Sequence, residues 1–234
     1  MNIKNDIQTR LDYFIELKRQ VQPYHTNRAS EIGHPCIRYL YYCRVYWHKR
    51  TQNSKSAQSV YLENIEQESS IIRLLLGLGF RIYDQGRSYS LSEFTIKGKI
   101  CGIISNNEFE KGIEIKCIDK TYFNEIGNGL SKSDEMWKHK LEIQVNLYMA
   151  MTHRSDWLVI LKNKNALELK FIEFNFDIDV YNKTIEKAMA INEAIKAVKL
   201  PDSNVRLYCE LCPFKDICKE DEMNIKKSDI MRGE

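Results

Sequence analysis

The sequence predicts a mixed α/β domain with a small appendage built from the two ends of the chain. Three observations predict it: helical apolar spacing in the first third, short strand-like segments in the middle, and three cysteines close together near the end. The expected order is three helices, four strands, a helix, two strands, a helix and a tail. A length of 234 residues suits one large domain or two small ones.

The first third of the chain has the spacing of helices. Residues 7–21 carry apolar side chains at helical intervals, and Pro35 suits the first turn of a second helix. Residues 51–59 have the composition of a loop. A strong helical pattern then covers residues 61–78, and Gly79 fits its C-terminal cap.

After this helix, the spacing of the apolar residues changes from that of a helix to that of strands. Strands separated by turns are predicted at residues 81–85, 89–98, 98–105 and 111–119. A helix is expected over residues 134–152, followed by strands at 156–162 and 166–174. A last helix covers residues 177–198, and Pro201 ends it. The charged end of the chain is expected to fray.

The composition narrows the classes of protein. Lys and Arg number 35 against 32 Asp and Glu, giving a net charge of +3, and 43% of the residues are hydrophobic. This balance excludes an intrinsically disordered chain. No apolar run reaches the roughly 18 residues of a membrane-spanning helix, and the first residues lack the apolar stretch of a secretion signal. We therefore expect a soluble, cytoplasmic protein, in which disulfides are rare.

The seven cysteines of such a protein need a role other than disulfide formation. Cys209, Cys212 and Cys218 have the spacing of ligands to one metal centre, because the turn between the first two brings their thiols together. The candidates for a fourth ligand are Cys36, Cys43, Cys101 and Cys117. The spacing alone fits zinc, an iron–sulfur cluster, or cysteines that are simply buried in a turn.

Charged and polar side chains form a second pattern. Glu68 falls on the apolar stripe of its helix, where a buried carboxylate needs a cation. Glu114 and Lys116 share one face of a strand, which suits a divalent metal and a developing negative charge. Gln144 and Tyr148 are one helical turn apart and can reach a phosphate backbone. Taken singly, each observation also fits an ordinary solvent-facing surface.

In their order along the chain, these motifs resemble the RecB-type nucleases of the PD-(D/E)XK superfamily. The resemblance covers residues 28–218 and extends to relatives whose iron–sulfur cluster ties the termini together: CRISPR-associated RecB-like exonucleases, the AddB nuclease domain and phage proteins. It implies a restriction-endonuclease-like core, a mixed central sheet flanked by helices, with an Fe–S subdomain formed from both ends. The implied ranges are 1–59 for the N-terminal helical segment, 60–200 for the core and 201–234 for the cysteine-bearing tail.

The cysteines divide into groups under this resemblance. The family's early cysteine segment is resembled by RASEIGHPCIRYLYY, which makes Cys36 the implied fourth ligand and Arg38 its basic neighbour. The family's C-terminal triplet is matched by Cys209, Cys212 and Cys218. A structural 4Fe–4S cluster is therefore implied, with zinc as the alternative. Cys43 and Cys117 remain as buried fillers.

The catalytic motifs of the family follow in sequence order. Its first acidic motif is resembled by ENIEQESSIIRLLLGLGF, which places the acid at Glu68. Its Glu-x-Lys motif is resembled by GIEIKC, with Glu114 and Lys116. Its Gln-x-x-x-Tyr helix is resembled by HKLEIQVNLYM, with Gln144 and Tyr148.

One position departs from the family pattern. The Gly-x-x-Asp-Gly motif is resembled by GKICGIIS, in which Cys101 occupies the Asp position. In the family that Asp is a central ligand of Mg²⁺ or Mn²⁺, and the other implied ligands are Glu68, Glu114 and the main-chain carbonyl of Ile115. Mg²⁺ prefers oxygen, for which a thiol is a poor substitute.

Three functions are compatible with these motifs. The first is a metal-dependent DNA nuclease of the RecB-like exonuclease type, acting on single strands or duplex ends. Lys116 would orient or help deprotonate water and stabilise charge, while Gln144 and Tyr148 would position the strand. The second is a nuclease-like protein that has lost catalysis through Cys101 and binds DNA or a protein partner, for instance in a phage–host system. The third is a zinc-binding structural module without a nucleic-acid role.

Overall fold

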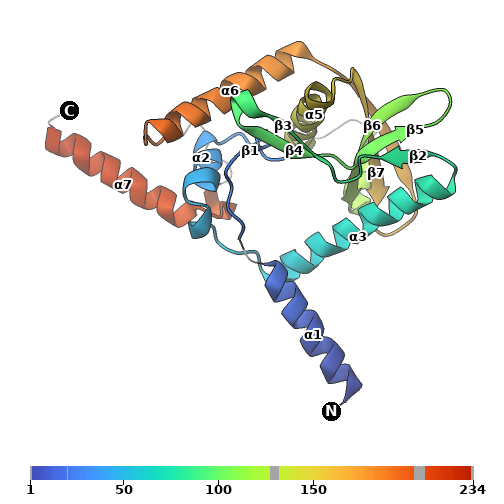
Figure 1. Cartoon of the computed structure of the whole chain (residues 1–234). Helices are drawn as coiled ribbons and strands as arrows, with labels where there is room; N and C mark the ends of the chain where they lie inside the picture. Colours follow the sequence, from blue (N-terminus) through green and yellow to red (C-terminus); the bar gives the residue numbers. More distant parts are fainter. Residues whose placement is uncertain (1, 20, 127–131, 203–208, 233–234) are drawn as a thin grey trace. The chain divides into compact units, whose positions relative to one another are not determined.

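The computed structural model describes residues 2–19, 21–126, 132–202 and 209–232. The chain divides into two compact units (Figure 1). The smaller unit contains residues 1–25, 35–58 and 193–234, and the larger contains residues 26–34 and 59–192. The domain ranges inferred from the sequence stay a prediction. In the part of the chain that is described, no helix has both the length and the apolar character needed to cross a membrane.

The smaller unit is helical. Its elements are α1 (Ile3–Lys18), α2 (Ile37–Val45), the 3₁₀ helices Trp47–Lys49 and Cys209–Leu211, and α7 (Lys215–Arg232). It also receives the first residues of α3 (Lys55–Gly77) and the last residues of α6 (Ile178–Lys196). Helix α7 lies where the sequence predicts a fraying end. The apolar residues Phe214 and Ile217 are buried at its start, and this burial stabilises its first turn.

The larger unit holds both sheets. Its strands are β1 (Asn27–Arg28), β2 (Arg81–Tyr83), β3 (Ser88–Leu91), β4 (Ile96–Lys99), β5 (Gly102–Ser105), β6 (Glu110–Ile118), β7 (Asp156–Asn163) and β8 (Leu169–Asn175). Between them lie the 3₁₀ helix Ser92–Phe94, α4 (Lys120–Glu125) and α5 (Lys132–Thr152). The small sheet has the order β1-β4-β3, and the central sheet has the order β2-β5-β6-β7-β8. The central sheet is mixed, because β6 and β7 are parallel and its other pairs are antiparallel.

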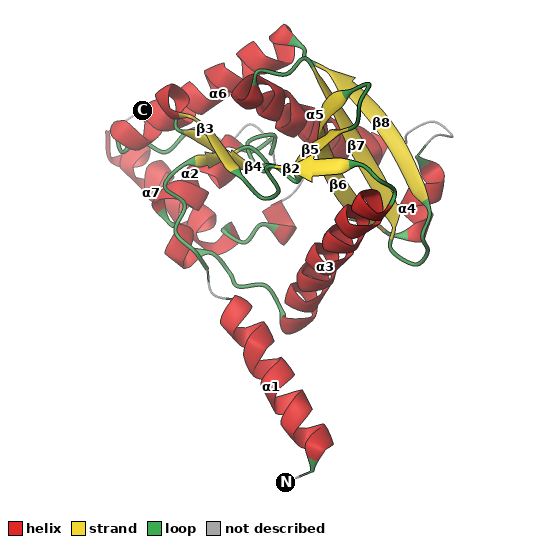
Figure 2. Ribbon diagram, turned by 45° about the vertical axis from the view of Figure 1, so that its right-hand side comes forward, coloured by secondary structure: helices red, strands yellow, loops and turns green. Residues whose placement is uncertain are grey.

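Helices cover both faces of the central sheet (Figure 2). Along β7, Trp157, Val159 and Leu161 pack with α5 and α6, whereas Leu158 and Ile160 pack with α3. This alternation follows from the period of two in a strand and explains why β7 is apolar almost throughout. The predicted mixed sheet flanked by helices is confirmed.

Two predicted segments differ in detail. Residues 89–98, expected as one strand, form β3, a 3₁₀ turn and β4, because Thr95 adopts a positive φ of 55° that reverses the chain. The short helix α4 was not predicted. Its N-terminal cap is Asp119, whose side chain accepts a hydrogen bond from the amide of Tyr122. A helix of only six residues is too short to show a clear apolar period in the sequence.

Replacing Gly112 of β6 with alanine is expected to lower the free energy of unfolding by about 2–3 kcal/mol. A Cβ at Gly112 would lie 2.1 Å from the ring of Trp157, which is fully buried. Gly77→Ala is the matched control, because a Cβ there meets nothing within 4 Å. Urea unfolding of the two variants measures the difference. Equal urea midpoints for Gly112→Ala and Gly77→Ala would contradict the prediction, because they would show that the packing of residue 112 against Trp157 can relax.

Candidate functional site

The candidate site lies where strand β5 ends beside the longer strand β6. The pairing of the two strands ends at Gly102 and Ile113, so the following residues of β6 have no β5 partner. The amide of Ile115 instead donates to the Sγ of Cys101 at 3.4 Å. Because the N–H and C=O of one strand residue point to the same side, the carbonyl of Ile115 also faces the side of Cys101. The amide and the carbonyl of Ile115, which have no partner on β5, therefore both face Cys101.

Glu114 is the centre of a network of buried side chains. Its Oε1 accepts from the Lys116 Nζ at 2.6 Å and from the Gln144 Nε2 at 2.8 Å. Its Oε2 accepts from the Cys101 thiol at 3.3 Å. Lys116 also donates to the Gln144 Oε1 at 3.3 Å. Glu114 is 4% exposed, so its charge is compensated by these neighbours and not by water.

Helix α5 contributes Gln144 and Tyr148 from the face that packs on the sheet. The Gln144 Nε2 also donates to the Tyr148 hydroxyl at 2.9 Å, and this hydroxyl donates to the main-chain carbonyl of Lys99 at 2.9 Å. Tyr148 can approach β4 this closely because residue 98 is glycine. A Cβ at Gly98 would lie 2.5 Å from the Tyr148 ring. Tyr148 therefore fixes α5 to the strand that leads into the site.

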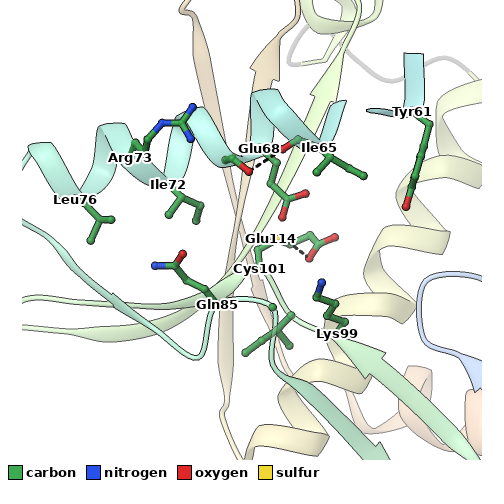
Figure 3. Close-up of a pocket in the computed structure, with 13 residues that line it drawn as sticks. Tyr61, Ile65, Glu68, Ile72, Arg73, Leu76, Gln85, Lys99, Cys101 and Glu114 are labelled. Carbon is green, nitrogen blue, oxygen red and sulfur yellow. Dashed lines mark hydrogen bonds between the residues drawn. The ribbon is translucent and has the colours of Figure 1, made fainter. Parts of the chain in front are cut away.

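Glu68 enters the site from α3, on the opposite face of the sheet. It lines a cavity of about 620 Å³ together with Cys101 and Glu114 (Figure 3). Burial raises the pKa of Glu68, and the negative charge of Glu114 adds to this effect, while the Cys101 thiol, Lys116 and Lys99 oppose it. Two carboxylates so close together create a site that a divalent cation would stabilise.

The protonation states of Cys101 and Lys116 follow from their surroundings. Burial raises the pKa of the Cys101 thiol well above its ordinary value, and the charges of Glu114 and Glu68 raise it further. Cys101 is therefore a neutral thiol that donates to Glu114. Burial lowers the pKa of Lys116, but the attraction and hydrogen bond of Glu114, together with the charge of Glu68, outweigh burial and leave this pKa raised. Lys116 is therefore an ammonium group at neutral pH.

The structure brings the predicted side chains into one cluster that joins α3, β6, α5 and the residue before β5: Glu68, Cys101, Glu114, Lys116, Gln144 and Tyr148. The basic part of the cavity, Lys99 and Arg73, was missed. Lys99 is two residues before Cys101, and residues two apart in a strand lie on the same face, so the sequence pattern could have indicated it. Arg73 has an ordinary position on α3, and no pattern in the sequence indicates it.

The smaller unit contains a second cavity, of about 370 Å³. The predicted cysteine ligands all line it: Cys36, Cys209, Cys212 and Cys218. Burial raises the pKa of Cys212, a backbone hydrogen bond from Phe214 opposes this effect, and the proximity of the other three cysteines adds to it. Arg38 places its Nη1 3.9 Å from the Cys218 Sγ and 2.9 Å from a carboxylate oxygen of Glu222. The four thiols are thus held around one space with a guanidinium beside them.

Neither cavity holds a ready site for a single ion. Among the residues that are described, no group of three or more His, Cys, Asp or Glu side chains is gathered closely enough for one metal ion. The four cysteines surround their cavity, an arrangement that suits the separate corners of a multi-iron cluster. In the larger unit, a cation would replace one of the contacts that Glu114 makes with Lys116, Gln144 or Cys101.

Comparisons with known proteins agree with the fold. No family model matches the chain, and no curated protein matches its sequence. The crystal structure of SSO0001 is similar, with a TM-score of 0.55 and 15% identity, covering 91% of this chain and 96% of that one. An alkaline exonuclease of Laribacter hongkongensis, LHK-Exo, has a TM-score of 0.55 and 15% identity, covering 80% and 93%. LHK-Exo in complex with dAMP has a TM-score of 0.52 and 16% identity, covering 74% and 88%. The chain therefore has a nuclease-like fold.

Proposed function

We propose that this chain is a metal-dependent DNA nuclease of the PD-(D/E)XK superfamily, of the RecB-like exonuclease type. The observation that carries the proposal is the buried contact of Lys116 with Glu114, supported by Gln144 from α5, within a fold similar to that of an alkaline exonuclease. An acid and a lysine two residues apart, beside an open strand end, are the groups that hydrolysis of a phosphodiester requires. The dAMP in the similar exonuclease complex favours DNA as the substrate.

The donor atoms fit a divalent cation with one reservation. The carboxylates of Glu68 and Glu114 line one cavity, and the carbonyl of Ile115 faces the same side as Cys101. These three oxygen donors would hold Mg²⁺ or Mn²⁺. Such an ion supplies an activated water and neutralises the charge that develops on phosphate. The reservation is Cys101, whose thiol suits Mn²⁺ better than Mg²⁺.

The side chains of this chain have separate roles around that centre. Lys116 is held as an ammonium group, so it orients water and stabilises negative charge on the phosphate and does not act as a base. Gln144 fixes the position of Lys116 through the 3.3 Å hydrogen bond. Tyr148 fixes Gln144 and the end of β4, so it is a positioning residue.

The cysteine cavity of the smaller unit has a structural role in this proposal. Four thiols around one space fit a 4Fe–4S cluster. They lie at the N-terminal cap of α2, in and directly after the 3₁₀ helix Cys209–Leu211, and in α7, so a cluster would join the two ends of the chain. Arg38 compensates negative charge at the thiols through its contacts with Cys218 and Glu222. Zinc is the alternative occupant.

A second candidate function rests on Cys101. A thiol at the place of a carboxylate removes a charged oxygen ligand, and the hydrogen bond from Cys101 occupies one oxygen of Glu114. A nuclease-like protein that binds DNA without cutting it is compatible with this arrangement. We favour the nuclease because the rest of the cluster, from Glu68 to Tyr148, is connected and complete.

Cleavage assays separate the two candidates. We expect the wild type to degrade labelled single- or double-stranded DNA with Mn²⁺, and Lys116→Ala to be at least about a hundredfold slower because it lacks a charge-stabilising group. Cys101→Asp is expected to raise the rate with Mg²⁺, since it restores an oxygen ligand. If Cys101→Asp cuts and the wild type does not cut with either ion, the second candidate is correct and the first is wrong.

A further inference from the structure

The cavity around Glu68 and Glu114 contains as many cationic as anionic side chains. Its charged lining consists of Glu68, Arg73, Lys99 and Glu114, two acidic residues and two basic ones. A carboxylate at position 101 would make the acidic residues three. Cys101 adds no charge and donates a hydrogen bond to the Oε2 of Glu114 at 3.3 Å. The thiol therefore shifts the charge of this cavity by one unit toward positive.

The carboxylate of Glu114 is already bound to partners within the protein. Glu114 is 4% exposed. It accepts hydrogen bonds from Cys101 and Gln144 and forms an ion pair with Lys116 at 2.6 Å. Lys116 contributes another positive charge beside Glu114. The negative potential of the site is thus compensated without any added cation.

Among the described residues, no hydrogen bond or ion pair holds either basic side chain, Lys99 or Arg73, although the charge of Lys99 favours the ionised form of Glu68. Both side chains line the cavity. Figure 3 shows the ammonium end of Lys99 pointing toward the carboxylates. Its stem crosses Gly86, where a Cβ would lie 2.9 Å from the Lys99 Cε. The glycine therefore leaves room for the stem and directs the ammonium group into the cavity.

We propose that this cavity binds the phosphodiester backbone of DNA directly through Lys99 and Arg73, without a divalent cation, and that the uncharged Cys101 makes this possible. Free lysine and arginine side chains are the usual partners of backbone phosphates. Three carboxylates at the same place would repel a phosphate until a cation had bound. The inference rests on the proposed function in taking DNA as the ligand. It adds that substrate binding does not require a bound metal ion.

Fluorescence anisotropy of a labelled single strand of about 20 nucleotides, titrated in EDTA, tests the inference. We expect the full-length wild type to bind, and Lys99→Gln and Arg73→Gln each to bind about fivefold more weakly with a salt slope smaller by about 0.7 to 1. Both side chains lack hydrogen bonds among the described residues, so these variants should fold normally. Lys138→Gln is the control, since Lys138 is an exposed lysine of α5 outside the cavity lining.

Variants of Cys101 test the role of the missing charge. In EDTA, Cys101→Asp is expected to bind DNA about tenfold more weakly, and added Mg²⁺ is expected to restore its affinity. Cys101→Asn has a similar shape without the charge and should bind like the wild type. A wild type that binds only after Mg²⁺ or Mn²⁺ is added, or a Lys99→Gln variant that binds like the wild type, overturns the inference while the proposed nuclease function stands. Absence of DNA binding with and without these ions overturns both.

Discussion

Replacing Glu114 with glutamine is expected to reduce DNA cleavage by about a thousandfold or more, the loss that follows when a site can no longer hold its metal ion. Glutamine keeps the shape of the side chain and one carbonyl oxygen, so Gln144 can still donate to it. It loses the negative charge that pairs with Lys116 at 2.6 Å and that would bind the cation. The measurement is the single-turnover rate of cleavage with saturating Mn²⁺.

Glu110→Gln is the matched control for this experiment. Glu110 lies on the same strand, β6, but its carboxylate is half exposed and pairs with Arg154 at 2.6 Å, away from the cavity. An exposed ion pair of this kind contributes little to stability, so this variant should cleave like the wild type. If Glu114→Gln retains the rate of Glu110→Gln while both remain folded, the proposed metal site is wrong.

Replacing Cys212 with serine is expected to remove most of the iron from the anaerobically purified protein and to lower its unfolding temperature. Cys212 lines the cavity of the smaller unit with the three other proposed ligands. A serine hydroxyl does not ionise near neutral pH and cannot replace a thiolate ligand. Iron and sulfide analysis, together with the broad absorbance near ~400 nm that iron–sulfur clusters show, measures the loss.

The control for the cluster is Cys43→Ala. Cys43 lies in α2, is buried and does not line the cavity, so its loss should leave the iron content unchanged. A colourless wild type with stoichiometric zinc would contradict the iron–sulfur proposal and support the zinc alternative. Equal iron contents in Cys212→Ser and Cys43→Ala would contradict any ligand role for Cys212.

The parts of the site that the sequence predicts best are those with a strong local period. Glu114 and Lys116 lie two apart on a strand, and Gln144 and Tyr148 lie four apart on a helix, so each pair necessarily shares a face. The contact between the two pairs is a tertiary feature. It depends on the crossover from β6 through α5 to β7, which no single segment encodes.

The structure also contains features that a sequence pattern does not indicate. Pairing of β5 with β6 stops at Gly102, and this end of the strand lets Glu68 from one face of the sheet meet Glu114 from the other. Lys99 becomes part of the cavity only because Gly86 from a separate turn leaves space for its stem. Such contacts depend on residues distant in sequence, so local periodicity carries no information about them.

Only two residues, Ile100 and Cys101, join strand β4 of the small sheet to strand β5 of the central sheet. The ammonium-bearing Lys99 thus belongs to one sheet, while the thiol precedes the other, and the hydroxyl of Tyr148 holds the junction at the carbonyl of Lys99. A shift of the small sheet relative to the central sheet would therefore directly change the distance between the Lys99 ammonium group and the carboxylates of Glu68 and Glu114.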